Sequence, residues 1–354
     1  MSEDRPGEQG ERSPRESYQQ IEHHPAAVEP GGEADYAAAE PGVDERAFAD
    51  EDPERASEGE DPAGALDEPE PANVGVVFEP DPRETERDEE DFRFHTGSGR
   101  PTKAPAAIEF IDVHKSFGRN HVLRGLNMEI PEGQVSMIIG PSGTGKSVCI
   151  KHIVGLLYPD QGDVIVHGES IPSLPDADLF ELRKKFGVLF QDGALFGSMD
   201  LYDNVAFPLR QHTEKSEEEI AEIVNRRMRE VGLGGEGTKM PNELSGGMRT
   251  RAGFARSLVL DPEIVLFDEP DSGLDPVRTA LLCELIKEVH AENGGAYVVI
   301  THDIMSARRV GEHISVLWKG RVVESGPAAD LFASENPFVR QFLSGASQGP
   351  LGME

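Results

Sequence analysis

The chain has 354 residues and a formal net charge of −32, with 66 acidic and 34 basic side chains. That balance argues against direct binding of a nucleic-acid backbone, for which clustered Lys and Arg would be expected. The sequence has no stretch of about 18 apolar residues, so no membrane-spanning helix is expected. Its two cysteines, Cys149 and Cys283, form no C-x-x-C pattern, which gives no indication of a zinc site and suits a reducing compartment.

The negative charge is concentrated at the start of the chain. Residues 1–100 contain 30 acidic and nine basic side chains and few large apolar ones. Such a segment cannot bury enough surface to offset its ordering entropy, so we expect a disordered acidic extension over residues 1–106. Its apolar cluster, 74–78, fits either a short docking motif or an uneventful part of a linker. Residues 1–6 lack the basic start of a signal peptide, so we expect a cytoplasmic protein.

Order is expected to begin near Ala106. Residues 107–111 alternate as a strand does, and Asn120-His121 is typical of a hairpin turn. Phe117 lies just before this turn. Its ring fits two roles, a platform on which a purine base stacks or a core or turn residue, and both stay open at this point.

A phosphate-binding loop organises the rest of the chain. Residues 140–147 read Gly-Pro-Ser-Gly-Thr-Gly-Lys-Ser and match G-x-x-x-x-G-K-[ST] at each fixed position. An apolar strand at 135–139 enters the loop and a helix with apolar residues at helical spacing leaves it, so free N–H groups would face one anion. Lys146 would sit on the β- and γ-phosphates and Ser147 on Mg²⁺. The alternative is a Gly-rich turn that precedes a helix by chance. The predicted nucleotide-binding residues are Gly140, Ser142, Gly143, Thr144, Gly145, Lys146 and Ser147.

Two features follow the first helix and a short amphipathic helix at 176–184. A strand at 186–190 ends in Gln191, whose side-chain amide can reach Mg²⁺ or an attacking water, although a residue in such a place is more often an ordinary polar strand end. The loop at 192–199 exposes apolar side chains, and it fits either a partner surface or a small local core. Those side chains are Leu195, Phe196 and Met199.

A second anion site is predicted at the start of a later helix. Ser216 and Glu219 form a capping box for one helix, which ends near Gly232. The next helix opens within residues 244–248, Leu-Ser-Gly-Gly-Met. A helix N-terminus presents free N–H groups and the positive end of the helix dipole to an anion. The residues of this predicted site are Ser245, Gly246 and Gly247.

Two adjacent carboxylates end the apolar strand at 264–267. Consecutive strand residues point to opposite sides, so Asp268 and Glu269 are expected to have different tasks. Asp268 is placed to hold Mg²⁺, and Glu269 to accept a proton from the attacking water. A parallel strand at 297–300 is followed by His302, which we expect to contact the γ-phosphate or Glu269.

With these residues in order, the chain resembles the nucleotide-binding subunits of ATP-binding-cassette (ABC) transporters over about residues 107–325. The motifs that carry the resemblance are the phosphate loop, Gln191, the signature 244–248, Asp268-Glu269, 272–275 and His302. The resemblance implies an α/β fold: a P-loop NTPase (RecA-like) core with an antiparallel β subdomain and a helical signature subdomain at about 192–255. A helical or extended tail is expected over 326–354.

The family likeness also implies how the site is shared. Such subunits form head-to-tail homodimers, so Ser245 and Gly247 would serve the other subunit's ATP, with Gly246 and Asp275 also among the nucleotide-binding residues. Phe117 takes the adenine-stacking position, which is usually Tyr. Met248 replaces the common Gln of the signature, a departure that some lipid-transport branches share.

A narrower resemblance points to the Mla/Mce class of lipid-transport ATPases, nearest to the shared ATPase of Mce lipid importers. It rests on residues 187–196, 203–210, 245–252, 269–278 and 339–343. It implies two ATPase copies, two membrane permeases that contact the chain near Leu195, Phe196 and Met199, and envelope lipid-binding proteins of the Mce/Mla type. The chain would then be peripheral on the inner face of the plasma membrane.

We therefore expect an ATPase that drives lipid transport, with ATP and Mg²⁺ as its cofactors. Glu269, His302 and Gln191 would be the catalytic residues, and Ser147, Gln191 and Asp268 the metal ligands. One alternative is a cassette for another cargo, an amino acid or an ion. A repair or translation ATPase fits less well, because such relatives carry coiled coils or a second cassette and only about a hundred residues separate Lys146 from Ser245. A silent scaffold is disfavoured by the intact catalytic set.

Overall fold

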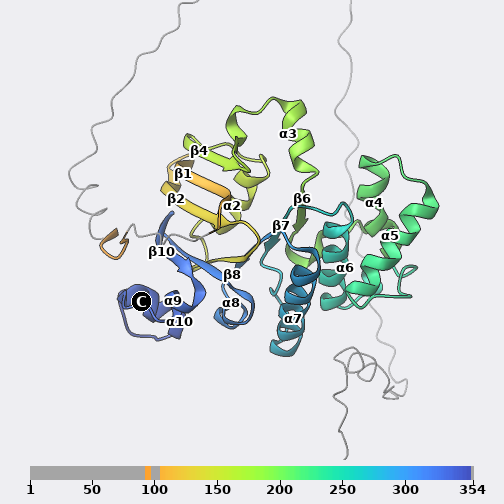
Figure 1. Ribbon diagram of the computed structural model, residues 1–354. Coiled ribbons are helices and arrows are strands. Elements are labelled where there is room, and N and C mark those ends of the chain that lie inside the picture. The colour runs from red at the N-terminus through yellow and green to blue at the C-terminus, as the bar shows by residue number, and fades with distance from the viewer. Residues whose placement is uncertain (1–91, 97–103, 352–354) are drawn as a thin grey trace, which may run out of the picture. The chain divides into compact units, whose positions relative to one another are not determined.

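The computed structural model describes residues 92–96 and 104–351, all within one unit of the chain, Pro80–Glu354. Most of the predicted acidic extension lies outside the described residues, and so does the apolar cluster 74–78. The helices and strands in chain order (Figure 1) are β1 (Ala106–Phe117), β2 (Asn120–Pro131), β3 (Val135–Ile139), α2 (Lys146–Ile153), β4 (Gln161–Val166), β5 (Glu169–Ser170), η2 (Ile171–Ser173), α3 (Asp176–Arg183), β6 (Phe186–Leu189), η3 (Gln191–Ala194), α4 (Leu201–His212), α5 (Glu217–Glu230), η4 (Pro241–Glu243), α6 (Gly246–Leu258), β7 (Ile264–Asp268), α7 (Pro276–Asn293), β8 (Ala296–Thr301), α8 (Ile304–Val310), β9 (His313–Trp318), β10 (Arg321–Pro327), α9 (Ala328–Phe332) and α10 (Pro337–Ser344).

The central sheet has six strands in the order β10-β9-β3-β8-β7-β6. Strands β9, β3, β8, β7 and β6 are parallel, and β10 pairs antiparallel to β9 as the closing hairpin. Every residue of β3 and of β8 is buried, as expected for apolar, β-branched runs covered on both faces. The carboxyl ends of the parallel strands therefore meet at one edge, where the predicted polar residues follow.

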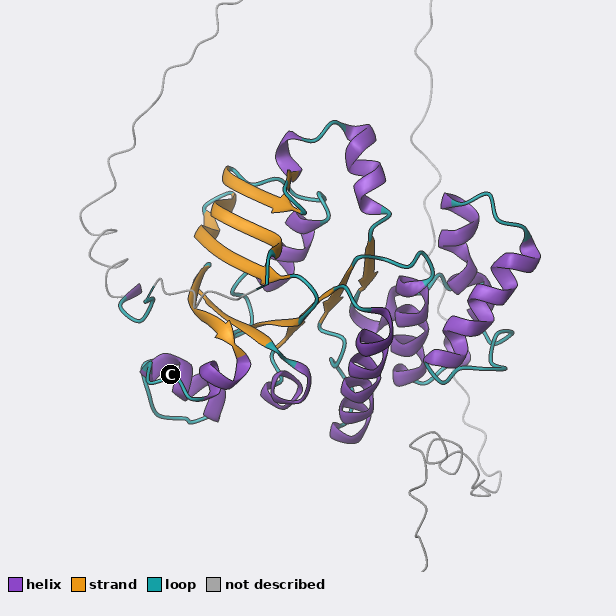
Figure 2. Cartoon of the chain, viewed as in Figure 1, coloured by secondary structure: helices purple, strands orange, loops and turns teal. Residues whose placement is uncertain are grey.

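Alternate residues of these strands enter two separate cores, because successive strand side chains point to opposite faces. Ile138, Leu266 and Val298 join one core together with residues of α2, α3 and the antiparallel sheet. Met137 and Phe267 join the other, with residues of helices α4 to α10. Helices α6, α7 and α8 lie beside the strands on this second face (Figure 2). The predicted α/β fold is confirmed.

The antiparallel sheet has the order β2-β1-β4-β5. Its first hairpin turns at Gly118-Arg119, two residues before the predicted Asn120-His121, because Asn120 already pairs with Phe117 across the hairpin. Gly118 supplies the positive φ of 60° that the turn requires. The predicted helix after the phosphate loop is confirmed as α2, which ends at Ile153, and the turn that follows contains Gly155 at a φ of 66°.

Helices α4, α5 and α6 pack against one another and form the helical part of the chain, at the right in Figure 1. The capping box of Ser216 and Glu219 is confirmed at the start of α5, with both reciprocal hydrogen bonds present. The structure adds α4, which sequence periodicity does not predict and which contains Pro208. Its Asn204 is fully buried.

Residues 92–96, a short described segment within the predicted extension, contact β10 and the C-terminal part of the chain. Asn336 donates a 2.8 Å hydrogen bond to the carbonyl of Phe94, and the Phe94 ring lies 6.5 Å from that of Phe338 at the start of α10. The guanidinium of Arg321 stands 4.0 Å above the ring of Phe92. Two phenylalanines give this short segment the apolar surface that most of the first hundred residues lack. Across the described ranges, none of the helices is both long and apolar enough to cross a membrane.

Candidate active site

The phosphate loop connects β3 to α2 and wraps around the side chain of Lys146. Gly143 and Gly145 adopt φ values of 80° and 97°, and a Cβ at Gly140 would collide with the carbonyl oxygen of Leu317. Lys146 is 4% exposed, and its Nζ donates to the carbonyls of Gly140 and Pro141 at 3.0 Å each. Burial lowers the pKa of Lys146, while Glu269 and Asp268 oppose that shift. The loop is thus a preformed cradle around one cation.

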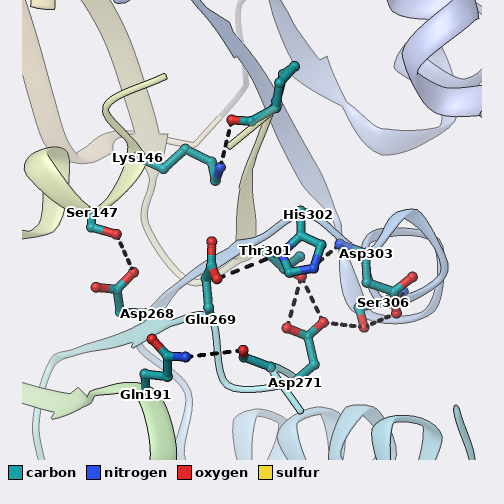
Figure 3. Close-up of polar contacts among 12 residues, drawn as sticks. Lys146, Ser147, Gln191, Asp268, Glu269, Asp271, Thr301, His302, Asp303 and Ser306 are labelled. Carbon is teal, nitrogen blue, oxygen red and sulfur yellow. Dashed lines mark hydrogen bonds and ion pairs between the residues drawn. The ribbon is translucent and has the colours of Figure 1, made fainter. Parts of the chain in front are cut away.

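Asp268 and Ser147 meet at the mouth of this loop. The Ser147 hydroxyl donates to Oδ1 of Asp268 at 2.8 Å (Figure 3). Burial raises the pKa of Asp268, and the hydrogen bond from Ser147 opposes that rise. One hydroxyl and one carboxylate from distant segments are thus brought together as a pair of oxygen donors.

Glu269 lies beyond the end of β7 and has a different partner. Its φ of 49° is unusual for a residue with a Cβ, and its backbone N–H is held by the Ile300 carbonyl at 2.9 Å. This turn directs the carboxylate toward His302, whose Nδ1 lies 3.7 Å from Glu269 Oε2. Figure 3 shows Asp268 turned to Ser147 and Glu269 turned to His302, so the two neighbouring acids occupy separate places.

Gln191 reaches the same edge from the end of β6. Its Nε2 donates to the hydroxyl of Ser272 at 3.2 Å, which links η3 to the loop after β7. Ser272 was not among the predicted site residues. Ser272 stands three residues after Glu269, and this closeness to the strand-end acids is the sequence feature that could have marked it as a site residue.

Asp271 is a second residue that the sequence reasoning missed. Its carboxylate accepts hydrogen bonds from the hydroxyl of Thr301, at 2.7 and 2.9 Å, and from that of Ser306 at 2.9 Å. Asp303 caps α8 and also accepts from Ser306 at 2.8 Å. This network fixes the backbone on both sides of His302 against the loop that carries Glu269. Thr301, the last residue of β8, could have been suspected from its place at the strand end.

The remaining predicted residues lie apart from this group. Ser245 caps α6, accepting from Met248 N at 3.4 Å, and Asp275 caps α7, accepting from the next two backbone N–H groups at 3.0 Å each. Phe117 ends β1 and is 48% exposed. In the described part of the chain, no hydrogen bond or ion pair joins the signature residues 245–247 to the phosphate loop of the same chain.

The residues present fit a triphosphate with a hard cation. Positive-φ glycines and the N-terminus of α2 leave backbone N–H groups for phosphate oxygens, and Lys146 supplies a positive charge. Ser147, Asp268 and Gln191 offer the oxygen donors that Mg²⁺ prefers. Among the described residues no set of three His, Cys, Asp or Glu side chains is arranged for a metal. A Mg²⁺ ion here would complete its shell with phosphate oxygens and water, as it usually does.

Comparison with known proteins agrees with this reading. The family model described as ABC transporter matches residues 123–272. The probable ribonucleotide transport ATP-binding protein mkl of Mycobacterium leprae (strain TN) is 51% identical over 257 residues, which are 73% of this chain and 74% of the relative. The chain belongs to the ATP-binding proteins of ABC transporters. As a member of this family, it binds ATP and is an ATPase.

Two further matches are a relative with a stated cargo and a solved ATP-binding cassette. The intermembrane phospholipid transport system ATP-binding protein MlaF of Escherichia coli (strain K12) is 38% identical over 244 residues, 69% of this chain and 91% of the relative. A solved dimeric ATP-binding cassette in a post-hydrolysis state, bound to ADP and Pi, matches with a TM-score of 0.58 and 32% identity over 62% of this chain and 98% of that one. The resemblance to the Mla/Mce class is confirmed.

Proposed function

We propose that this ABC ATPase energises lipid transport of the Mla/Mce type through a separate membrane permease. The observation that carries the ATPase part is the meeting of the Ser147–Asp268 and Glu269–His302 pairs at one sheet edge. The descriptions of the relatives differ in cargo, a ribonucleotide for mkl and a phospholipid for MlaF. The lipid reading is supported by the coverage of nearly the whole length of MlaF and by the lipid-class motifs at 187–196 and 269–278.

In the proposed mechanism, the chain's own groups hold the triphosphate and position the water. Lys146 and the backbone N–H groups of 140–147 hold the phosphates, and Ser147, Asp268 and Gln191 bind Mg²⁺. When bound, Mg²⁺ neutralises the charge on the phosphate oxygens. Glu269 orients the attacking water and accepts its proton, while His302 steadies the γ-phosphate. Positioning and charge stabilisation supply most of the acceleration in phosphoryl transfer.

The functional unit would be a homodimer with shared sites. The signature residues Ser245, Gly246 and Gly247 stand at the N-terminus of α6, where free N–H groups suit an anion, yet they bond to none of the described residues of their own phosphate loop. The dimeric state of the matched cassette supports their use by a second copy. Asp275 would join them, and Phe117 would stack on the adenine of its own subunit's ATP.

The permease contact is proposed at the apolar loop that contains Leu195, Phe196 and Met199. Phe196 is 43% exposed, and its ring packs 4.9 Å from Phe207 and lies 5.6 Å below the guanidinium of Arg256. Leu195 instead packs partly against the core. The loop is therefore anchored on the core through Leu195 and presents the exposed ring of Phe196 to a partner. Through this contact the chain would be held on the inner face of the plasma membrane, with Mce/Mla-type lipid-binding proteins completing the complex.

Isolation of the native complex tests the cargo. The tagged chain is purified with its permease in mild detergent, reconstituted into vesicles, and assayed for ATP-dependent movement of a labelled phospholipid, a labelled ribonucleotide and a labelled amino acid. The same complex with Glu269→Gln is the control for ATP dependence. Movement of the phospholipid alone is expected. Movement of the ribonucleotide or the amino acid in its place would leave the ATPase assignment intact and overturn the lipid cargo.

A further inference from the structure

The end of strand β1 that carries Phe117 is held by Asp160. Strands β1 and β4 pair only as far as His114 opposite Gln161, so the last residues of β1 lie beyond the reach of β4. Asp160, one residue before β4, takes over the pairing: its N–H donates to the His114 carbonyl at 2.8 Å, and its Oδ2 accepts from Ser116 N at 2.6 Å. A carboxylate thus continues the hydrogen-bond ladder that the strand no longer provides.

The same carboxylate also holds Lys115. Asp160 Oδ1 accepts from Lys115 Nζ at 2.8 Å, and the Lys115 side chain is 16% exposed. The hydrogen bond from Lys115, followed by that from Ser116, holds the pKa of Asp160 below its ordinary value. Nζ of Lys115 lies 5.8 Å from the centroid of the Phe117 ring, within the range of a cation–π contact. One face of the ring is therefore backed by a fixed cation.

Asp160 belongs to the loop that leaves α2, the helix that starts with Lys146 and Ser147. This loop is wound back on the helix, since the N–H groups of Leu156 and Leu157 both donate to the carbonyl of Lys151, at 2.8 and 3.0 Å. One side chain thus joins the strand end that carries the aromatic ring to the loop that follows the phosphate-binding helix.

We propose that Asp160 is a positioning residue for the nucleotide base: with Lys115, it fixes the Phe117 ring relative to the phosphate loop, so that ring and loop grip opposite ends of one nucleoside triphosphate. The proposal rests on the assignment of Phe117 as the base platform. Because the ring is held before ATP arrives, little conformational freedom is lost when the base stacks. The face of Phe117 opposite Lys115 takes the purine.

Inorganic tripolyphosphate separates this role from a merely structural one, because it offers the phosphate loop its charge without a base. Binding of ATP and of tripolyphosphate, each with Mg²⁺, is measured by calorimetry on the purified full-length chain and on its variants. The variants are Asp160→Ala, Asp160→Asn, Phe117→Ala and the double variant that combines Asp160→Ala with Phe117→Ala. Gln161→Ala, an exposed neighbour, is the matched control. Stacking of a base on an aromatic ring predicts a loss of roughly ten-fold for Phe117→Ala with ATP.

Asp160→Ala should weaken ATP binding by roughly the same factor and leave tripolyphosphate binding unchanged. Asp160→Asn, which keeps one acceptor for Ser116 N, should lose less. The double variant should bind ATP no more weakly than Phe117→Ala alone, because Asp160 acts through the ring. Equal losses of ATP and tripolyphosphate in Asp160→Ala, or no loss of ATP while Phe117→Ala does lose it, would overturn the positioning role. Unchanged ATP binding in Phe117→Ala would overturn the base platform itself, and the positioning role with it.

Discussion

The Ser147 hydroxyl donates a 2.8 Å hydrogen bond to Oδ1 of Asp268, joining residues that are 121 positions apart in the sequence. The first opens α2 and the second ends β7, so the contact exists only because β3, β8 and β7 lie side by side with their carboxyl ends at one edge. Two oxygen donors are thereby held in place before any cation binds.

This pair predicts how Mg²⁺ dependence is lost. In Ser147→Ala the pKa of Asp268 should rise further, because the hydrogen bond that opposes the effect of burial is gone. We expect Ser147→Ala and Asp268→Asn each to reduce the gain in ATP affinity that Mg²⁺ provides by about ten-fold or more, since each removes a ligand or its orientation. Titration of ATP with Mg²⁺ and with EDTA measures that gain. Variants that respond to Mg²⁺ as the unmodified chain does would remove both residues from the metal site.

Glu269→Gln should separate binding from turnover. The amide keeps the size of the carboxylate and leaves the backbone hydrogen bond to Ile300 in place, but it cannot accept a proton from water. A positioned general base contributes roughly 10²–10⁴-fold, so ATP hydrolysis should fall by at least about 100-fold with ATP affinity unchanged. Single-turnover hydrolysis and equilibrium binding, both on the assembled complex, provide the two readings. Near-parental hydrolysis would show that another group activates the water.

Phe196→Asp should uncouple the ATPase from its permease without affecting nucleotide binding. A carboxylate placed at this exposed ring would have to be desolvated when an apolar partner surface packs there. Ile111→Asp is a matched control, since Ile111 is 44% exposed against 43% for Phe196 and lies on β1 in the antiparallel sheet. Pull-down of the permease and ATP-driven transport are measured for both. Equal effects of the two substitutions, or intact transport in Phe196→Asp, would place the coupling surface elsewhere.

Segments with a continuous apolar run were predictable from sequence, together with the polar residues that follow them. Strands β3, β7 and β8 are buried on both faces, so their composition alone marks them, and the adjacency of parallel strand ends brings Gln191, Asp268 and Glu269 to one edge. The phosphate loop was predictable for a different reason, because its chemistry fixes residue types at fixed spacing.

Helix α4 was not predictable in the same way. It contains Pro208, which usually ends a helix, and its buried face includes the polar Asn204. Asn204 is satisfied by the loop just before its own helix: it accepts from Phe196 N at 2.7 Å, and its amide nitrogen bonds to the carbonyls of Phe196, Met199 and Asp200 at 2.9 to 3.1 Å. No periodic pattern in the sequence reveals such a set of bonds.

The hydrogen-bond network of Asp271 could not be predicted from the sequence for a related reason. Asp271 bonds to hydroxyls that lie 30 and 35 positions further along the chain, and each of these residue types is common in turns. The contacts of residues 92–96 were not predicted because composition was averaged over a hundred residues. That average does not reveal two phenylalanines, which have partners on β10 and α10. Local pattern predicts which elements form, whereas these contacts depend on how the elements meet.

A buried histidine, His313, should make the stability of the protein fall in mild acid. It is the first residue of β9, it is 3% exposed, and its Nδ1 has no hydrogen-bond partner among the described residues. Burial lowers the pKa of His313 to about 4. Below a pH of about 6.5 His313 is protonated in the unfolded chain, whereas in the folded chain it stays neutral until about pH 4. The free energy of unfolding therefore decreases as the pH falls through this window.

Between pH 7.5 and pH 5.5 this one group should remove about 1.4 kcal/mol from the free energy of unfolding. In His313→Gln, which cannot be protonated, that part of the pH dependence should disappear, even if the substitution shifts the stability at both pH values. His212→Gln is the control, since His212 is an exposed residue. Urea unfolding of the three proteins at the two pH values gives the differences. A His313→Gln protein that loses as much stability in acid as the unmodified chain would show that His313 is protonated in the folded state.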